Sequence, residues 1–325
     1  MKLLFIADPL GSFRIYKDST YTMMVEAARR GHAIYALEPR ELAMSDGVVR
    51  SRARRIELID VDSAGDPHGP RDDWFRIAEQ TDAALTEFDA VVMRKDPPFD
   101  MEYVTTTWLL EHARRAGARV FNDPAAIRDH NEKAAILEFP QFLAPTLVTR
   151  ERARILQFHA EHRDIIIKPL DGMGGMGIFR VGPDGLNINS IVETLGLDGA
   201  RTLMVQRYIP EIVDGDKRVL LIGGTVVPFC LARVPMAGET RGNLAAGGTG
   251  IARPLTPRDR EIGEALAPVL AARGLLLVGL DVIGNNLTEI NVTSPTCFRE
   301  IMDQTGFDVA ALMIDSIEAA LEQAA

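Results

Sequence analysis

The spacing of apolar and polar positions predicts strands alternating with helices along the first third of the chain. The run "LLFIAD" is short and apolar, which is typical of a buried strand. The next segment, "DSTYTMMVEAARRG", spaces its apolar residues three and four apart, with Asp18 or Ser19 as N-cap and Gly31 as its stop. Further strand and helix patterns follow up to "ARVFN". This alternation predicts an N-terminal parallel α/β lobe over residues 1–122.

Two segments of this lobe differ from the simple alternation. The stretch "SDGVVRSRARRIELIDV" opens on Asp46 and Gly47, a turn pair, and predicts an antiparallel excursion. The stretch "MRKDPPFD" directly follows a predicted strand. Ligands of parallel sheets bind at the carboxyl ends of the strands, so Arg94, Lys95 and Asp96 are candidates for contact with a substrate.

A glycine-rich loop lies between two predicted strands in "DIIIKPLDGMGGMGIFRV", residues 164–181. Gly172, Gly174 and Gly175 allow backbone N–H groups to turn toward an anion such as phosphate. A dinucleotide-binding fingerprint needs a helix after its glycines, and a Walker loop needs Gly-Lys before Ser or Thr; neither is present. The pattern instead predicts strand, glycine flap and strand over a nucleotide. Lys168 can contact a phosphate oxygen there, or it can extend to solvent from the strand end.

The rest of the chain predicts a two-lobed unit over residues 123–325. A helical connector carrying Lys133, a strand, a helix, the flap and the strand "TLMVQRYIP" form a central lobe at about 123–210. Two strands around a Gly-Gly turn, a helix, a hairpin and a last helix form a C-terminal lobe at about 211–325. A cleft is expected between the two lobes. The aperiodic segment 236–250, with Arg241 and Asn243, is typical of a lid, although a surface loop has the same composition.

The late hairpin "VGLDVIGNNLTEINV" gathers three oxygen-bearing side chains. If its strands pair about Asn285, Asp281 lies opposite Glu289, since each is four residues from that centre. Glu289 and Asn291 are two residues apart and share a face of their strand. Two carboxylates and an amide oxygen suit Mg²⁺ bound with substrate phosphates, and zinc ligands are missing. The alternative, a polar edge strand with solvated acids, is disfavoured by the apolar flanking residues.

Two arginines occur within largely apolar segments that predict neighbouring strands. Arg218 belongs to "DKRVLLIG" and Arg233 to "FCLARVP". A buried arginine needs an anionic partner, which is either internal, such as Asp216, or a ligand phosphate. Gln206 and Tyr208 end another predicted strand, where they can pack on a purine, although an ordinary core strand has the same pattern.

Composition narrows the possible partners. A net charge of -10 and a pI near 5.2 argue against sequence-independent binding of nucleic acid. The two cysteines, Cys230 and Cys297, imply no disulfide framework, fit a reducing cytoplasm and are expected to be small buried side chains. The first apolar run is too short for a signal peptide, and no segment is long and apolar enough to span a membrane. These observations leave small molecules among the possible partners.

With these segments in place, the sequence resembles the bacterial glutathione synthetases of the ATP-grasp superfamily. The likeness runs in order through "KDST", "MRKDPPFD", "NEK", "IIIKPLDGMGGMGIFRV", "DGDKRVL", "CLARVP", "ETRGNLAAGG", "VGLDVIG" and "LTEINVTSPT". It implies the ATP-grasp fold, in which an N-terminal α/β lobe precedes a two-lobed nucleotide-binding unit. It also implies a cytoplasmic, homo-oligomeric enzyme that joins γ-glutamylcysteine to glycine with ATP.

The resemblance implies a role for each candidate residue. The ATP-binding set is Lys133, Lys168, Gly172, Gly174, Gly175, Gln206, Tyr208 and Ile209. The metal-binding set, for Mg²⁺ with Mn²⁺ as an alternative, is Asp281, Glu289 and Asn291. The substrate-binding set is Arg94, Asp216, Arg241, Asn243, Ser294, Pro295 and Thr296. Arg218 and Arg233 are the expected catalytic residues, which steady the transferred phosphoryl group and the tetrahedral intermediate.

The implied reaction agrees with these residue types. ATP converts the cysteinyl carboxylate into an acyl phosphate, and the amine of glycine then displaces phosphate. Cations offset the charge of phosphoryl transfer, and the acyl phosphate must be shielded from water. Two alternatives stay open: another ATP-grasp ligase, such as one for two D-alanines or for a peptide tail, and a nucleotide-binding module without turnover. The strand after the glycines disfavours a dehydrogenase.

Overall fold

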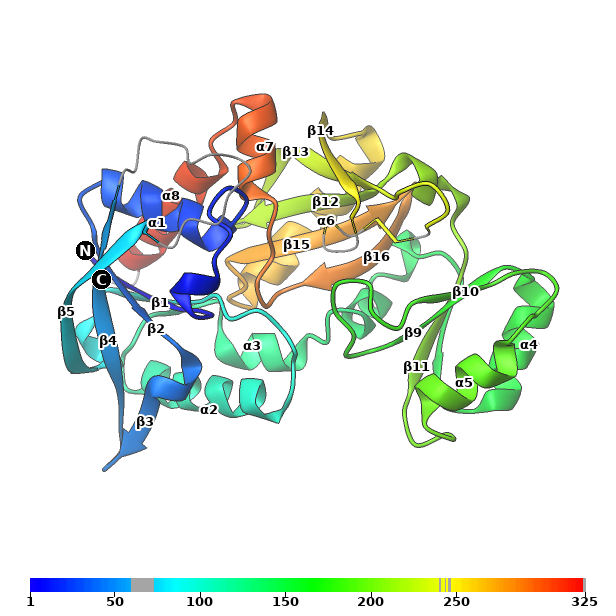
Figure 1. The fold of residues 1–325 in the computed structure, drawn as a ribbon, viewed down its shortest axis with the longest axis horizontal. Coiled ribbons are helices and arrows are strands. Elements are labelled where there is room, and N and C mark those ends of the chain that lie inside the picture. Colours follow the sequence, from blue (N-terminus) through cyan, green and yellow to red (C-terminus); the bar gives the residue numbers. More distant parts are fainter. Residues whose placement is uncertain (60–72, 240, 243, 245–246, 324–325) are drawn as a thin grey trace.

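The computed structural model describes residues 1–59, 73–239, 241–242, 244 and 247–323. Figure 1 shows their arrangement as three sheets with covering helices. Successive sheets take up the N-terminal, central and C-terminal parts of the chain, in agreement with the predicted order of lobes. None of the helices within the described ranges is long and apolar enough to cross a lipid bilayer.

The N-terminal sheet has a parallel centre and an antiparallel margin. Its order is β3-β4-β2-β1-β6-β7, and β5 pairs with β4. The neighbours among β1, β2, β6 and β7 are parallel, whereas β4 runs antiparallel to β2, β3 and β5. The strands are β1 (Lys2–Ile6), β2 (Ala33–Leu37), β3 (Leu42–Ser45), β4 (Val48–Leu58), β5 (Phe75–Ala84), β6 (Ala90–Met93) and β7 (Val120–Phe121). The predicted parallel lobe and its excursion are confirmed.

Two long helices of this lobe begin at aspartates. α1 (Ser19–Arg29) has Asp18 as its N-cap, whose Oδ1 accepts a hydrogen bond from the backbone N of Tyr21 at 2.7 Å. α2 (Met101–Arg115) has Asp100 in the same position, and its Oδ1 accepts from the backbone N of Tyr103 at 2.9 Å. Each carboxylate satisfies a backbone donor that the helix itself leaves free.

The central lobe contains the predicted flap between two paired strands. Its antiparallel sheet has the order β10-β9-β11-β8, covered by two helices. These elements are β8 (Thr146–Thr149), β9 (Ile165–Pro169), β10 (Phe179–Val181), β11 (Leu203–Arg207), α4 (Arg152–His162) and α5 (Ile188–Gly196). The connector contains α3 (Pro124–Asp129) and a 3-10 helix at Ala134–Glu138. The strand after the glycines is thus confirmed.

The C-terminal lobe is built on a five-stranded antiparallel sheet of order β14-β13-β12-β15-β16. Its strands are β12 (Asp216–Ile222), β13 (Thr225–Val234), β14 (Thr249–Pro254), β15 (Leu277–Ile283) and β16 (Asn286–Asn291). Its helices are α6 (Pro257–Ala272), α7 (Phe298–Thr305) and α8 (Val309–Glu322). The last two residues of the predicted lid, 249 and 250, belong to β14.

The hydrophobic core unites the two ends of the chain. One cluster joins Phe5 of β1 and Met24 of α1 to Phe298 of α7 and Ile314 of α8. Figure 1 shows α8 lying beside α1. A second cluster joins the other face of the N-terminal sheet to α6 and the C-terminal sheet. The central lobe has its own smaller core around Ile165 and other residues of β9 and β11.

Candidate active site

The hairpin of β15 and β16 brings the three predicted metal ligands to one patch. Asp281 pairs with Glu289 in the strand register, as predicted. All three side chains, Asp281, Glu289 and Asn291, line the same cavity. The Nδ2 atom of Asn291 donates to the carbonyl of Gly279 at 3.1 Å, which leaves the amide oxygen as the group that can contact a cation.

A β-bulge makes this arrangement compatible with a packed core. The register shifts between Asp281 and Val282, so that Thr288 is an extra residue on β16. Leu287 and Ile290 can therefore both be fully buried in the core, while Glu289 between them is turned to the cavity. The turn prediction missed this shift, because a bulge leaves no mark in the alternation near a turn.

Two buried arginines neutralise the carboxylates next to this patch. Arg218 lies opposite Asp281 in the register, and its Nε is 2.6 Å from Oδ1 of Asp281. Arg233 lies opposite Asp216, and its Nη2 is 2.5 Å from Oδ2 of Asp216 and 2.9 Å from Oδ2 of Asp281. Both arginines therefore have internal partners, which was one of the two predicted alternatives.

The two aspartates of this network have opposite pKa shifts. Burial by itself would raise the pKa of Asp281, but Arg218 and Arg233 outweigh burial and hold it well below its usual range. Burial raises the pKa of Asp216 to about 6, in spite of Arg233. Oδ1 of Asp216 is buried and has no hydrogen-bond partner among the described residues. It is a carboxylate oxygen available to a further donor or cation.

Glycine at position 279 leaves the space that Arg218 occupies. A Cβ atom on Gly279 would lie 2.8 Å from Cδ of Arg218 and 2.9 Å from Cβ of Pro295. Both distances are shorter than carbon atoms tolerate, so a larger residue would displace the arginine or the loop that carries Pro295. The sequence alone offered no sign of this packing, since the residues are far apart in the chain.

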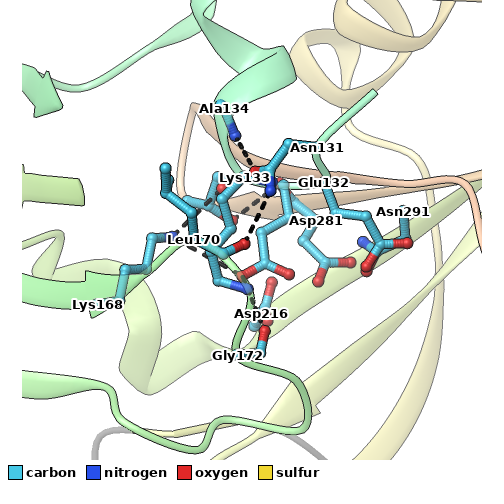
Figure 2. A network of polar contacts seen from close by, with 12 residues as sticks. Asn131, Glu132, Lys133, Ala134, Lys168, Leu170, Gly172, Asp216, Asp281 and Asn291 are labelled. Atoms are coloured by element: carbon cyan, nitrogen blue, oxygen red, sulfur yellow. Dashed lines mark hydrogen bonds and ion pairs between the residues drawn. The ribbon is translucent and has the colours of Figure 1, made fainter. Parts of the chain in front are cut away.

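The predicted lysines approach the metal-ligand patch from the connector and from β9. The Nζ atoms of Lys133 and Lys168 lie 3.4 and 3.8 Å from Oε1 of Glu289. Lys133 also donates to the carbonyl of Gly172 in the flap. Burial lowers the pKa of Lys168, although Glu289 opposes that shift. Figure 2 shows the lysines and the carboxylates of Asp216 and Asp281 gathered in one network.

Two neighbours of Lys133 hold the connector in place. Nδ2 of Asn131 donates to the carbonyl of Leu170 at 3.1 Å, and its Oδ1 accepts from the backbone N of Ala134 at 2.9 Å (Figure 2). Oε1 of Glu132 accepts from the backbone N atoms of Val292 and Thr293, at 2.9 and 3.1 Å. The sequence analysis assigned no role to Asn131 or Glu132, although both belong to the quoted motif "NEK".

A first cavity of about 820 Å³ lies between the central and C-terminal sheets. Strand alternation explains its floor: Ile165 and Ile167 face the core of the central lobe, whereas Ile166 and Lys168 face the cavity. Gln206 pairs with Ile166 on the adjacent strand. The cavity is lined by all eight residues of the predicted ATP-binding set: Lys133, Lys168, Gly172, Gly174, Gly175, Gln206, Tyr208 and Ile209.

The apolar walls of the first cavity were not predicted. Ile166, Ile178, Ile212 and Ile283 line it from four different segments. Of these four residues, only Ile166 could have been predicted from the sequence, because it alternates with Lys168 along its strand. The other three become neighbours through the packing of distant segments. Apolar walls beside a cluster of cations suit a ligand with an apolar ring and phosphates.

A second cavity adjoins the first, and both are lined by Gly172, Gly174, Asp281 and Glu289. It also contains side chains of both predicted catalytic arginines, Arg218 and Arg233. Its remaining predicted residues are Asp96, Asn291, Ser294, Pro295 and Thr296. Glu132 and Thr293 line it as well and were missed. The two cavities meet where lysines, arginines and carboxylates are densest.

Two predicted substrate residues, Arg94 and Arg241, lie apart from this centre. Arg94 is buried at the end of β6 and lines a third cavity with Ser294 and Thr296. Arg241 lines the first cavity and forms an ion pair with Glu239 of its own loop at 2.6 Å. Asn243 lies outside the described residues. The lid that these loop residues were expected to form stays a prediction.

The donor set fits a hard divalent cation. Two carboxylates and one amide oxygen face one cavity, and an orphan carboxylate oxygen of Asp216 lies in the adjoining one. Within the described ranges, no group of three or more His, Cys, Asp and Glu side chains is arranged to hold a metal. Magnesium, which keeps several waters and binds few protein ligands along with phosphates, is compatible with so sparse a set.

Comparison with known proteins identifies the family. The model of the prokaryotic glutathione synthetase N-terminal domain matches residues 1–128, and the model of the ATP-grasp domain of the same family matches residues 132–306. The glutathione synthetase of Ralstonia nicotianae is 62% identical over 324 residues, which cover 100% of this chain and 97% of the relative. That of Neisseria meningitidis serogroup B is 58% identical over 319 residues, 98% of each chain.

Solved structures of more distant proteins have the same fold. The D-cycloserine synthetase DcsG matches with a TM-score of 0.67 at 15% identity, over 98% of this chain and 99% of that one. The ATP-grasp ligase PsnB, complexed with minimal precursor, Mg and ADP, matches with a TM-score of 0.61 at 17% identity, over 99% and 98%. The fold is therefore an ATP-grasp fold, and the chain belongs to the prokaryotic glutathione synthetase family.

Proposed function

We propose that this chain, as a glutathione synthetase, joins γ-glutamylcysteine to glycine and converts ATP to ADP and phosphate. The high identity to named glutathione synthetases over the full length supports the overall reaction. The observation that carries the mechanism is the meeting of two cavities at Asp281 and Glu289. One cavity suits a nucleotide, and the other contains the arginines that a carboxylate acceptor needs.

The phosphates of ATP lie between the flap and the lysines in this proposal. Lys133 and Lys168 contact phosphate oxygens, and backbone N–H groups of Gly174 and Gly175 complete the cradle. The apolar walls of the first cavity and Gln206 hold the adenine ring. A magnesium ion would be held by Asp281, Glu289 and Asn291, and when bound it supplies charge neutralisation at the phosphates.

Arg218 and Arg233 stabilise the negative charge that develops during transfer. Their guanidinium groups are fixed by Asp216 and Asp281, so they need no reorganisation when the γ-phosphoryl group moves to the cysteinyl carboxylate. The same two groups face the oxyanion that forms when the amine of glycine attacks the acyl phosphate. No side-chain nucleophile takes part, because ATP itself activates the carboxylate.

Product analysis tests the proposal directly. Purified protein with ATP, magnesium, γ-glutamylcysteine and glycine should release ADP, phosphate and glutathione in equal amounts. Omission of glycine should reduce ADP release to a slow leak, and D-alanine should not replace the dipeptide. Formation of AMP and pyrophosphate would contradict the γ-phosphoryl mechanism. Formation of ADP only with another carboxylate would preserve the mechanism and reject the substrate.

We also propose, from the family resemblance, that the enzyme is a homo-oligomer that acts in the cytoplasm. Light scattering after size-exclusion chromatography should give a mass that is a multiple of 35.7 kDa. A single-chain mass at working concentrations would contradict the oligomer.

A further inference from the structure

Gln206 is a buried amide in the wall of the first cavity. It is 4% exposed and lies near the end of β11, between β8 and β9. Its register partners are Thr146 on β8 and Ile166 on β9. Residues that are paired across neighbouring strands point to the same face of a sheet, and Ile166 lines the first cavity. The amide of Gln206 therefore lies on the cavity side of the sheet, with Thr146 beside it.

Thr146 determines which end of this amide faces the cavity. Oγ1 of Thr146 donates its one hydrogen to the carbonyl of Ala144 at 2.8 Å, because a carbonyl oxygen can only accept. The same Oγ1 lies 3.0 Å from Nε2 of Gln206, and only its lone pairs are left for that contact. Gln206 must therefore donate through Nε2. A turned amide would place Oε1 against the hydroxyl oxygen with no hydrogen between them.

The oxygen of the amide is left for a ligand. The side chain of Gln206 forms one hydrogen bond with the described residues, through Nε2 to Thr146, so Oε1 accepts from no protein donor among them. Oε1 is not sealed in the interior in the way that the unpartnered Oδ1 of Asp216 is. It is therefore open to the cavity. A single acceptor at the wall of a largely apolar cavity selects a ligand that carries a donor at that point.

The strand register places this acceptor away from the phosphate end of the cavity. Lys168 on β9 pairs with Met204, and Gln206 follows two residues later on β11. Two residues of a strand span about 7 Å, so Gln206 lies along the strand from the lysine that contacts phosphate in the proposed function. The adenine ring occupies that end of the cavity. Its exocyclic 6-amino group is a donor, whereas the 6-oxo group of guanine or hypoxanthine is an acceptor.

We propose that Thr146 sets the base specificity of the enzyme by holding Gln206 with its amide oxygen toward the 6-amino group of adenine. The inference rests on the proposed function and deepens it, since it concerns the nucleotide in the first cavity. Thr146 is a positioning residue, because it acts through Gln206 and is not among the residues that line the cavity. A 6-oxo purine brings a second acceptor against Oε1, which leaves both oxygens desolvated without a hydrogen bond.

Three nucleotides test the assignment on the wild-type enzyme. Purine riboside triphosphate has only a hydrogen at position 6, and ITP has the 6-oxo group together with a proton on N1. Relative to ATP, kcat/KM should fall about tenfold for the first, which loses one hydrogen bond, and about 100-fold or more for ITP. Calorimetry with ADP and IDP should give the same preference without turnover. Equal use of ATP and ITP would overturn the proposal.

The variant Thr146→Val removes the hydroxyl and keeps the shape of the side chain. The amide of Gln206 is then free to turn Nε2 toward a 6-oxo group. The ratio of kcat/KM for ATP to kcat/KM for ITP should therefore fall about tenfold or more. The value of kcat at saturating ATP should hardly change, because the lysines and arginines of the site are intact. Thr146→Ser restores the hydroxyl and should restore the wild-type ratio.

Thr149→Val is the matched control. Thr149 also lies on β8, and its Oγ1 accepts from the backbone N of Glu151 at 3.0 Å, but its register partner is Leu203. The control removes a hydroxyl hydrogen bond away from Gln206, so the ratio of ATP to ITP should stay at its wild-type value. An unchanged ratio in Thr146→Val, or an equal fall in Thr149→Val, would overturn the proposal.

The two proposals fail separately. A wild-type enzyme that makes glutathione but does not discriminate between ATP and ITP rejects the role of Thr146 alone. Failure to make glutathione with any of the three nucleotides rejects the proposed function, and the binding of ADP and IDP to wild type and Thr146→Val then still tests the role of Thr146.

Discussion

The arginines of the C-terminal sheet and the arginine of the N-terminal lobe are equally buried but differently paired. Arg218 and Arg233 are 6% and 4% exposed, and Arg94 is 3% exposed. The first two share Asp216 and Asp281 in a closed network. Arg94 has only neutral hydrogen-bond partners among the described residues. The exposed fraction of these arginines therefore does not distinguish the two regions. What distinguishes them is whether each arginine has a carboxylate partner.

The two regions therefore differ in whether a buried arginine already has a carboxylate partner in the absence of ligand. The two arginines of the C-terminal network are held by carboxylates before ligands bind, so their charges are oriented in advance for the proposed reaction, in which charge moves. Arg94 in the N-terminal lobe has no carboxylate partner among the described residues, so it is suited to pairing with an anion.

Removal of the charge of Glu289, which lies beside this network, should have the largest effect on activity. Glu289→Gln retains the shape of the side chain but loses the charge that Lys133 and Lys168 approach. We expect kcat to fall by about 100-fold or more, because this carboxylate is a proposed ligand of the cation at the phosphates. Steady-state kinetics with a thermal unfolding scan will check this. Normal turnover at ordinary magnesium would contradict the metal assignment.

Stability should distinguish the paired from the unpaired arginine. Arg218→Met leaves the buried carboxylate of Asp281 with one partner fewer, and we expect a loss of about 3–5 kcal/mol in the free energy of unfolding. Arg94→Met removes a charge that has no ionic partner, so the loss should be only about 1–2 kcal/mol for its two hydrogen bonds. Chemical denaturation of both variants measures the difference.

The double variant Arg218→Met with Asp281→Asn is the control for this pair. Removal of the carboxylate charge should restore part of the stability lost in Arg218→Met. Equal losses of unfolding free energy in Arg218→Met and Arg94→Met would contradict the view that only Arg218 neutralises a buried carboxylate.

Packing around the complete network should be intolerant of added atoms. A Cβ atom at position 279 would collide with Arg218 and Pro295. We expect Gly279→Ala to lower the free energy of unfolding by about 1–3 kcal/mol and to reduce kcat. Gly11, near the third cavity, has no neighbour within 4 Å of such an atom. Gly11→Ala should stay within about 0.5 kcal/mol of wild type, and an equal effect of both changes would refute the comparison.

Local sequence patterns predicted much of the fold and part of the candidate site. The alternation around Lys168 predicted strand, flap and strand, and four-residue symmetry about Asn285 predicted the pairing of Asp281 with Glu289. Internal partners for Arg218 and Arg233 were one of two predicted alternatives, with Asp216 named. Both cysteines are buried as expected. These features depend on neighbours in sequence or on adjacent strands.

Features that depend on distant packing were missed. β5 is mostly exposed, so it lacks the apolar alternation that marks a strand. The expected contact of Arg94 with substrate stays a prediction. Its hydrogen bonds to Thr20 and Pro295, which join segments about 75 and 200 residues away, were not predicted. The pairing state of a buried charge cannot be read from a sequence, because the partner is chosen by the fold.

The joined core has a consequence for synthesis on the ribosome. The apolar faces of β1 and α1 are covered by α7 and α8, which are translated after all other described elements. The N-terminal lobe therefore emerges with part of its interior open to solvent and stays so until α7 and α8 have left the exit tunnel. The central lobe has a separate core and can therefore fold earlier during translation. A chain that is truncated before α7 should therefore expose the apolar residues of β1 and α1 that these helices cover.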